Sequence, residues 1–223
     1  MAYSRGNSNN IIVGAASFFV ADSVLTPDTG VNPLPAFVGS ESYRETLADD
    51  VDFVNVGYTT NGLELQFQPD FGEVRVDQLL DVAKLYKQGM QVNLATAFAE
   101  ATLENLLLAI AGKSTDLDAK GDSLLGTGKY GSDGQELTLS AGNLGECPVE
   151  RGIVAVGPGT GDCEDSGQVE RVYAAYRALS IENVTVSAKR DEASMFEVSF
   201  RLLPDDSDAS YGKIVDRTWT VGS

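Results

Sequence analysis

The chain has 223 residues, and its 33 acidic and 16 basic side chains give a formal net charge of −17. Hydrophobic residues make up 43% of it, which is enough for a sizeable core and excludes wholesale disorder. The acidic excess excludes a surface built to hold nucleic acid by its phosphates, and the absence of histidine excludes Ser-His and Cys-His catalytic pairs.

Residues 1–21 are predicted to form an N-terminal arm that ends in a strand over 11–21. This apolar run loosely resembles a signal peptide ending near Ala21, but the polar residues just before it favour a strand. It is too short to cross a bilayer, so we expect no membrane insertion. Residues 22–50 contain three prolines and are predicted to be a long loop, because proline cannot donate to a strand ladder.

Asn61-Gly62 is the strongest turn signal in the chain, and it predicts a hairpin of strands 53–60 and 63–70. A two-residue turn would place Tyr58 opposite Leu65. The hairpin would then have one apolar face and one polar face, as in a sheet with one wet side.

The next segment is predicted to hold a short strand over 73–77, a short helix over 77–89 and a strand over 90–95. Residues 96–111 have the clearest helical pattern, capped by Thr96 and stopped by Gly112. This helix should pack on the apolar face of the sheet. Its predicted core stripe is Phe98, Leu103, Leu106, Leu107 and Ile110.

The second half of the chain begins with a Gly- and Asp-rich insertion over 113–168, with short strand-like pieces at 136–140 and 152–156. Strands are then predicted over 169–179, 184–189, 196–202 and 214–221, with an acidic loop over 205–212. We therefore predict one domain over 1–223, of α+β class and mainly β, with an antiparallel sandwich or barrel-type sheet and one packed helix.

No motif predicts catalysis, a cofactor or a metal. Gly112-Lys113-Ser114 ends a helix instead of opening one, and the GxGxxG match at 126–131 lacks the flanking strand and helix. A calcium-like pattern from Asp116 lacks its closing acid. We therefore do not expect the protein to be an enzyme. Cys147 and Cys163 fit either a loop-closing disulfide or two free thiols.

Polar side chains recur on one face of the predicted strands, and this face is either plain solvent-exposed surface or the wall of a channel. Its members are Glu64, Gln66, Gln68, Gln91, Asn93, Glu197, Ser199 and Arg201.

The stretch from Val51 to Leu65 resembles the central hairpin of tail tube proteins (major tail proteins) of long-tailed bacteriophages. Residues 73–78 and 89–106 resemble the next strands and the helix of that family, and residues 178–184 with Leu203-Pro204-Asp205 resemble its C-terminal half. Residues 22–50 and 113–168 fit the resemblance poorly.

This resemblance implies a structural virion protein that forms hexameric rings stacked into a hollow tail tube. Each subunit would give strands to a shared inner β-barrel, with the helix outside and the eight polar residues facing the lumen. Viral DNA and a tape-measure protein would pass through the bore. The partners would be further copies and other tail proteins, in a phage tail assembled in the host cytoplasm.

A lumen of acids and amides would repel phosphate and let DNA slide. Arg201 departs from this pattern and is expected to pair with Glu197 or with an acid of the next subunit. Two alternatives remain open: a single-ring tail component, such as a terminator or baseplate ring, and a secreted acidic β-rich module that binds carbohydrate or cations.

Overall fold

The computed structural model describes residues 12–25, 38–118, 135–160, 169–186, 190, 193–207 and 209–220. The fold is mainly β, as predicted. One sheet has the order β3-β1-β6-β7-β8-β5-β4, and β9 pairs with β7 and with the short β2. The strands are β1 Ser17–Ala21, β2 Val38–Gly39, β3 Phe53–Asn55, β4 Thr59–Val74, β5 Lys84–Phe98, β6 Arg151–Pro158, β7 Val169–Ser180, β8 Phe196–Leu203 and β9 Gly212–Trp219. The α-helices are α1 Tyr43–Asp49 and α2 Leu103–Ala109.

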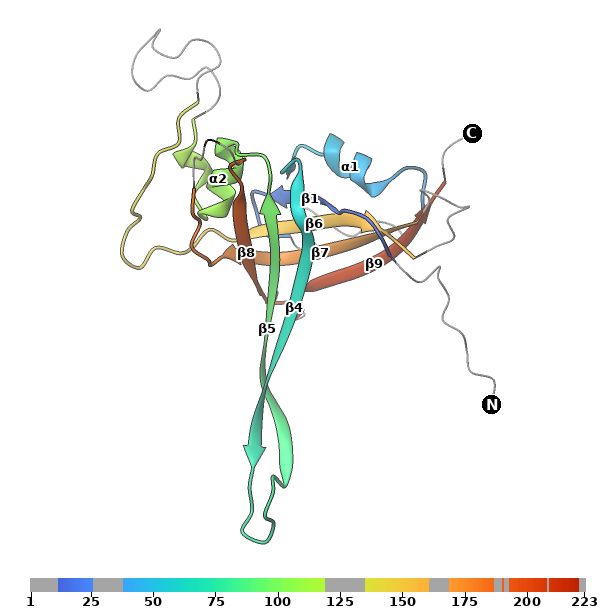
Figure 1. Cartoon of the computed structure of the whole chain (residues 1–223), viewed down its shortest axis with the longest axis vertical. Coiled ribbons are helices and arrows are strands. Elements are labelled where there is room, and N and C mark those ends of the chain that lie inside the picture. Colours follow the sequence, from blue (N-terminus) through green and yellow to red (C-terminus); the bar gives the residue numbers. More distant parts are fainter. Residues whose placement is uncertain are drawn as a thin grey trace.

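The sheet divides at β7. One edge of β7 pairs with β6, and its other edge is shared, with 169–175 pairing with β9 and 177–180 pairing with β8. Between these two stretches, the Tyr176 backbone N–H donates to the carbonyl of Tyr211 at 3.1 Å. Strands β8, β5 and β4 therefore leave the body as a separate branch and run across β1, β6, β7 and β9 (Figure 1).

The core lies on both faces of β6, whose residues are buried from Arg151 to Gly157. Ile153 and Ala155 belong to one cluster, in which the Phe18 ring lies 5.8 Å from Phe98 and 6.2 Å from Phe200. The alternate residues belong to a second cluster, which includes Leu47 of α1. Because both faces are covered, β6 reads as a continuous apolar run and not as an alternating one.

The segment 22–50, predicted to be a loop, contains β2 and α1. Ser42 caps α1 by accepting a hydrogen bond from the Arg44 N–H at 3.3 Å. Tyr43 and Leu47 are the buried residues of the helix. A seven-residue helix with two inward side chains gives too short a periodic pattern to recognise among prolines and acids.

A buried ion pair holds α1 to the sheet. The Glu170 carboxylate of β7 accepts from Arg217 Nη1 at 2.7 Å, from the Tyr43 backbone N–H at 2.7 Å and from Ser42 Oγ at 2.8 Å. Glu170 and Arg217 are each 5% exposed, and the guanidinium lies 5.5 Å from the Tyr43 ring centroid. Burial raises the pKa of Tyr43 to about 12, so this ring stays neutral beside the cation.

The hairpin predicted at Asn61-Gly62 is wrong. Both residues have positive φ, at 64° and 69°, but β4 continues through them. Residues 61–63 form a bulge between the pairs Thr60–Ala97 and Glu64–Ala95. The strand before the bulge cannot fold back onto β4, because Phe53–Asn55 pairs with β1 and buries Phe53. The actual hairpin joins β4 to β5 through residues 75–83.

Both helices predicted after the hairpin need correction. Residues 84–89 lie in β5, so the helix over 77–89 is wrong. The helix over 96–111 is only α2, capped by Thr102 instead of Thr96, because inward alternation in β5 continues to Phe98. Of the predicted stripe, Phe98 and Leu107 are buried, Leu103 and Leu106 are half-buried, and Ile110 is exposed. Residues 108 and 109 of α2 do join the sheet core, as expected.

The C-terminal strands largely follow the prediction. The pieces at 152–156, 169–179 and 196–202 lie within β6, β7 and β8, and the last strand begins at Gly212. The piece at 136–140 forms only one bridge, between Leu117 and Leu137. Residues 184–186 are not in a strand, and 187–189 lie outside the described residues, as do 1–11. Cys147 is exposed and Cys163 lies outside the described residues, so both cysteine alternatives stay open.

Replacing Glu170 by glutamine is expected to lower the free energy of unfolding by about 3 kcal/mol, because the buried Arg217 loses its ion pair with Glu170. Asp216→Asn is the matched control on the same ladder. Its half-buried partner Arg171 holds the pKa of Asp216 below its usual range through hydrogen bonds. Asp216 itself is exposed, and a pair of this kind at the surface contributes only about 0–1 kcal/mol. Urea unfolding followed by the fluorescence of Trp219 measures both changes. Equal losses in the two variants would contradict the role given to Glu170.

Candidate functional site: a polar sheet face backed by an apolar groove

The eight polar residues singled out from the sequence lie on one face of the β4–β5–β8 branch. The pairing of the three strands sets them in cross-strand rows. One row is Gln66–Asn93–Arg201, and the row beside it is Glu64–Ala95–Ser199. Gln68 pairs with Gln91, and Glu197 pairs with Ala97. Directly paired antiparallel residues point to the same side, so the eight side chains share one surface.

Amide and carboxylate groups on this polar face bond to one another along β4 and along β5. Gln66 Nε2 donates to Glu64 Oε1 at 2.8 Å, and Gln91 Nε2 donates to Asn93 Oδ1 at 3.2 Å. Ser199 is buried, while Glu64, Gln66 and Gln68 are exposed. The face is therefore largely exposed to solvent, and its side chains bond to neighbours two residues away on the same strand. These eight residues form no pair of a nucleophile and a base.

The charges on the polar face are unevenly placed. Glu64 and Glu197 line one shallow hollow together with Glu182, and Arg201 lines the next hollow along the branch together with Asp70. Within the described residues, no ion pair or hydrogen bond involves the Arg201 side chain, so the expected pair with Glu197 is not made. Four residues of extended strand, about 13 Å, separate the two. A partner for Arg201 from another subunit remains a prediction.

Strand β4 is the last strand of the sheet, so its outer edge pairs with no described strand. Unpaired strand edges attract further strands unless they are short, covered or interrupted. This edge is 16 residues long and contains one proline, Pro69. The polar face therefore ends at an edge that is open to β-pairing with another chain.

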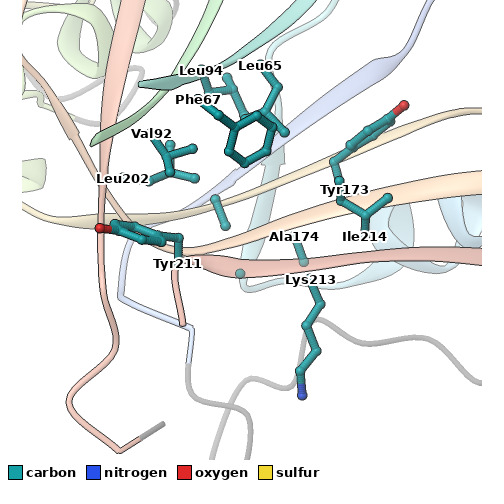
Figure 2. A pocket seen from close by; sticks show the side chains of 12 residues that line it. Leu65, Phe67, Val92, Leu94, Tyr173, Ala174, Leu202, Tyr211, Lys213 and Ile214 are labelled. Atoms are coloured by element: carbon teal, nitrogen blue, oxygen red, sulfur yellow. The ribbon is translucent and has the colours of Figure 1, made fainter. Parts of the chain in front are cut away.

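Behind the polar face lies an apolar groove, at the angle where the sheet divides. Its near wall is the opposite face of the branch, with Leu65 and Phe67 of β4 and Leu94 of β5 (Figure 2). Its far wall comes from β7 and β9, with Tyr173 and Ile214. The sequence analysis did not identify this groove, because its walls come from strands far apart in the chain.

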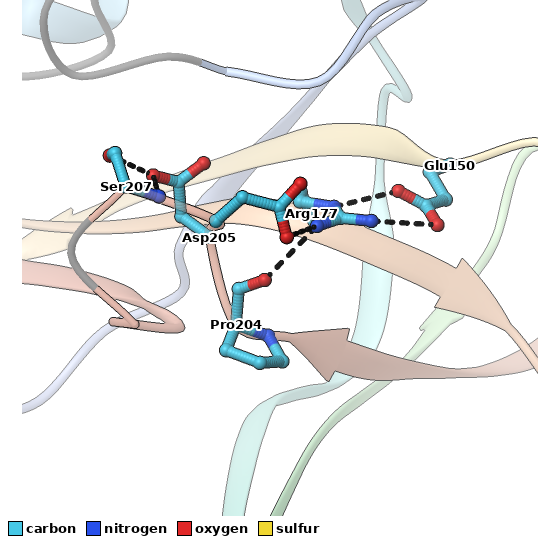
Figure 3. Close-up of polar contacts among 6 residues, drawn as sticks. Glu150, Arg177, Pro204, Asp205 and Ser207 are labelled. Atoms are coloured by element: carbon cyan, nitrogen blue, oxygen red, sulfur yellow. Dashed lines mark hydrogen bonds and ion pairs between the residues drawn. The ribbon is translucent and has the colours of Figure 1, made fainter.

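One arginine fixes the loop that joins the two branches, β8 to β9. Arg177 donates to both oxygens of Glu150, at 2.8 and 3.2 Å, and to the Pro204 carbonyl at 3.2 Å (Figure 3). It also donates to Asp206 at 3.0 Å, and these bonds raise its pKa, the bond to Glu150 most strongly. After this loop, Tyr211 donates its hydroxyl proton to the Met90 carbonyl at 2.6 Å, which ties β5 to the start of β9.

The described part of the chain contains no group of three acids or cysteines placed to bind a metal ion. None of its helices is long and apolar enough to cross a membrane. The clearest surface features are therefore the polar face, the open edge of β4 and the apolar groove.

Gly62→Ala is expected to lower the free energy of unfolding by about 1–2 kcal/mol, because Gly62 has φ of 69° and alanine is strained there. The bulge is also held by Thr96 Oγ1, which donates to the Gly62 carbonyl at 2.8 Å. Gly89→Ala is the matched control. An added Cβ at either position meets no atom within 4 Å, but Gly89 has no positive φ. Urea unfolding compares the two variants, and equal stabilities would contradict a strained bulge.

No family model matches this chain, and no curated protein matches its sequence.

Proposed function

We propose that this chain is the subunit of a hollow tube, the tail tube of a long-tailed bacteriophage, in which stacked hexameric rings conduct viral DNA. The observation that carries the proposal is the polar face on the three-stranded branch, together with the open edge of β4 beside it. A face of this kind becomes the inner wall of a barrel when branches from neighbouring copies pair edge to edge.

Closure removes the problem posed by the open edge. A barrel shared among copies leaves no unpaired lateral edge, and its strands alternate between an inward and an outward face. In this arrangement Gln66, Asn93 and Arg201 point into the bore. Leu65, Phe67 and Leu94 point outward, toward the part of the subunit that carries β7 and β9.

The chemistry of the polar face suits the passage of DNA better than its retention. Binding to the phosphate backbone is driven by lysine and arginine that displace counterions. This face presents four amides, a hydroxyl and two carboxylates against the single guanidinium of Arg201. A duplex in such a bore meets weak, exchangeable hydrogen bonds and little attraction, so it slides. The tape-measure protein and other tail proteins are the further partners in the virion.

Negative-stain electron microscopy of the purified chain, fresh and after concentration, tests the proposal. Six-fold rings or hollow tubes are expected. Assemblies without a central channel, such as sheets or solid fibres, would contradict it. Persistent single rings would favour the terminator or baseplate alternative.

Adding positive charge to the polar face tests the role of the bore. Gln66→Lys with Gln91→Lys is expected to make tubes that retain short double-stranded DNA at low salt, whereas wild-type tubes do not. Retention measured by filter binding should fall steeply as salt is raised. The control carries two lysines at exposed loop positions, Leu139→Lys and Leu144→Lys, and is expected to retain no DNA. Equal retention by both variants would place the polar face outside the bore.

A further inference from the structure

One hollow on the polar face gathers three carboxylates around small side chains. Ala95 and Ala97 lie on β5, the middle strand of the branch, and leave room between the longer side chains of the neighbouring strands. Glu64 lies on the β4 side of the hollow and Glu197 on the β8 side. Glu182, which follows the end of β7, lines it as well. We call this feature the acidic hollow.

The charge of the acidic hollow is not balanced by the chain itself. Its lining has three acidic side chains and no basic one. Within the described residues, none of the three carboxylates takes part in an ion pair, and Glu64 accepts a bond only from the neutral amide of Gln66, at 2.8 Å. A hollow lined by one sign of charge concentrates ions of the opposite sign. The acidic hollow is therefore suited to a cation.

A buried hydroxyl group points into the acidic hollow. Ser199 is 6% exposed, although it lies on the polar side of β8 between the exposed Glu197 and Arg201. The row Glu64–Ala95–Ser199 places its side chain at the hollow, which it lines. Among the described residues, no hydrogen bond involves the Ser199 hydroxyl. Buried polar groups normally have a partner, so this hydroxyl is placed to bond to a ligand.

The spacing of the carboxylates selects the kind of cation. In the described part of the chain, no three acids or cysteines lie close enough to bind one metal ion, and this includes Glu64, Glu182 and Glu197. A cation that contacts all three must therefore be extended. The acidic hollow encloses about 380 Å³, within the range of about 300–1,000 Å³ that sites for small molecules occupy.

We propose that the acidic hollow binds an aliphatic polyamine, a flexible chain that carries two or more ammonium groups. Each ammonium group has up to three N–H donors, and the hollow offers carboxylate oxygens, amide oxygens and the Ser199 hydroxyl as acceptors. Hydrogen bonds between ammonium and carboxylate groups are assisted by charge and are about twice as strong as neutral ones. The methylene segments of the polyamine lie over Ala95 and Ala97.

The acidic hollow is built by a single chain, from the three strands of the branch and the segment after β7. Polyamine binding therefore goes beyond the proposed function and does not require the tube. In a tube, each copy would present its acidic hollow to the bore. Binding is measured per chain, and the form of the assembly is observed separately by microscopy.

Isothermal titration of the full chain with spermidine, at low salt and without divalent metal, tests the proposal. Saturable binding with one site per chain is expected. Glu64→Gln with Glu197→Gln should weaken it at least about tenfold, because two charged acceptors are lost. Asp49→Asn with Asp52→Asn removes the same charge at exposed positions outside the hollow and should bind as the wild type does. Equal losses in the two double variants would mean that spermidine follows net charge, and would overturn the site.

Ser199→Ala distinguishes a defined site from a diffuse layer of counterions. It is expected to weaken spermidine binding about threefold, since one hydrogen bond to the ligand is lost. Ser23→Ala, at an exposed position outside the hollow, is the matched control and should change nothing. Circular dichroism should show an unchanged fold for all variants. Unchanged binding by Ser199→Ala, or displacement of spermidine by an equal concentration of magnesium, would overturn the inference.

The outcomes for the site and for the tube are distinguishable. Saturable binding by a chain whose assemblies lack a central channel would overturn the proposed tube and leave the polyamine site standing. Hollow tubes that bind no spermidine would overturn the polyamine site alone.

Discussion

The division of the sheet at β7 is the constraint on which the other features depend. One edge of this strand has two partners, β9 along its first half and β8 along its last residues. A flat sheet cannot hold β8 and β9 along the same edge of β7. Strand β8 therefore turns out of the sheet, and β5 and β4, which pair with it in order, follow the same direction. The apolar groove is the angle left between the two branches, and the polar face is the surface of the branch that points away from it.

The branch therefore has to satisfy two environments. In β4, Leu65 and Phe67 point into the groove, while Glu64, Gln66 and Gln68 lie on the polar face. A slip of one residue would reverse every one of these side chains. The bulge at residues 61–63 and the bond from Thr96 to Gly62 fix the register at one end of the ladder. The tie from Tyr211 to Met90 holds β5 farther along.

Local sequence patterns predicted which side of each strand is buried better than they predicted which strands pair with each other. Alternation in 90–95 and 196–202 predicted which side chains are buried, with the exception of Ser199, because a pleated strand with one dry face leaves that pattern whatever it pairs with. Asn61-Gly62 misled because its backbone preference is real, with both residues at positive φ, but the same conformation serves a bulge as well as a turn. Only the pairing of Phe53 with β1, about thirty residues earlier, decides between them.

Long-range features left no trace in the sequence. The ion pair of Glu170 and Arg217 joins residues 47 positions apart, and each looks like an ordinary surface charge until α1 covers it. The groove likewise collects residues from β4, β5, β7, β8 and β9. The eight polar residues could be predicted because the alternation within each strand indicates its solvent-facing side. The groove could not, because it forms only where the folded sheet divides.

The outer part of the β4–β5 hairpin, residues 71–88, projects away from the body (Figure 1) and extends a ladder whose base is already fixed by the body. A loop or tail that recruits a partner must lose backbone freedom as it does so, at about 1–2 kcal/mol for each residue that becomes ordered. The paired residues 71–74 and 84–87 have lost that freedom on folding. Any molecule that contacts the exposed apolar side chains of these pairs therefore meets a backbone that is already ordered and has little further entropy to lose.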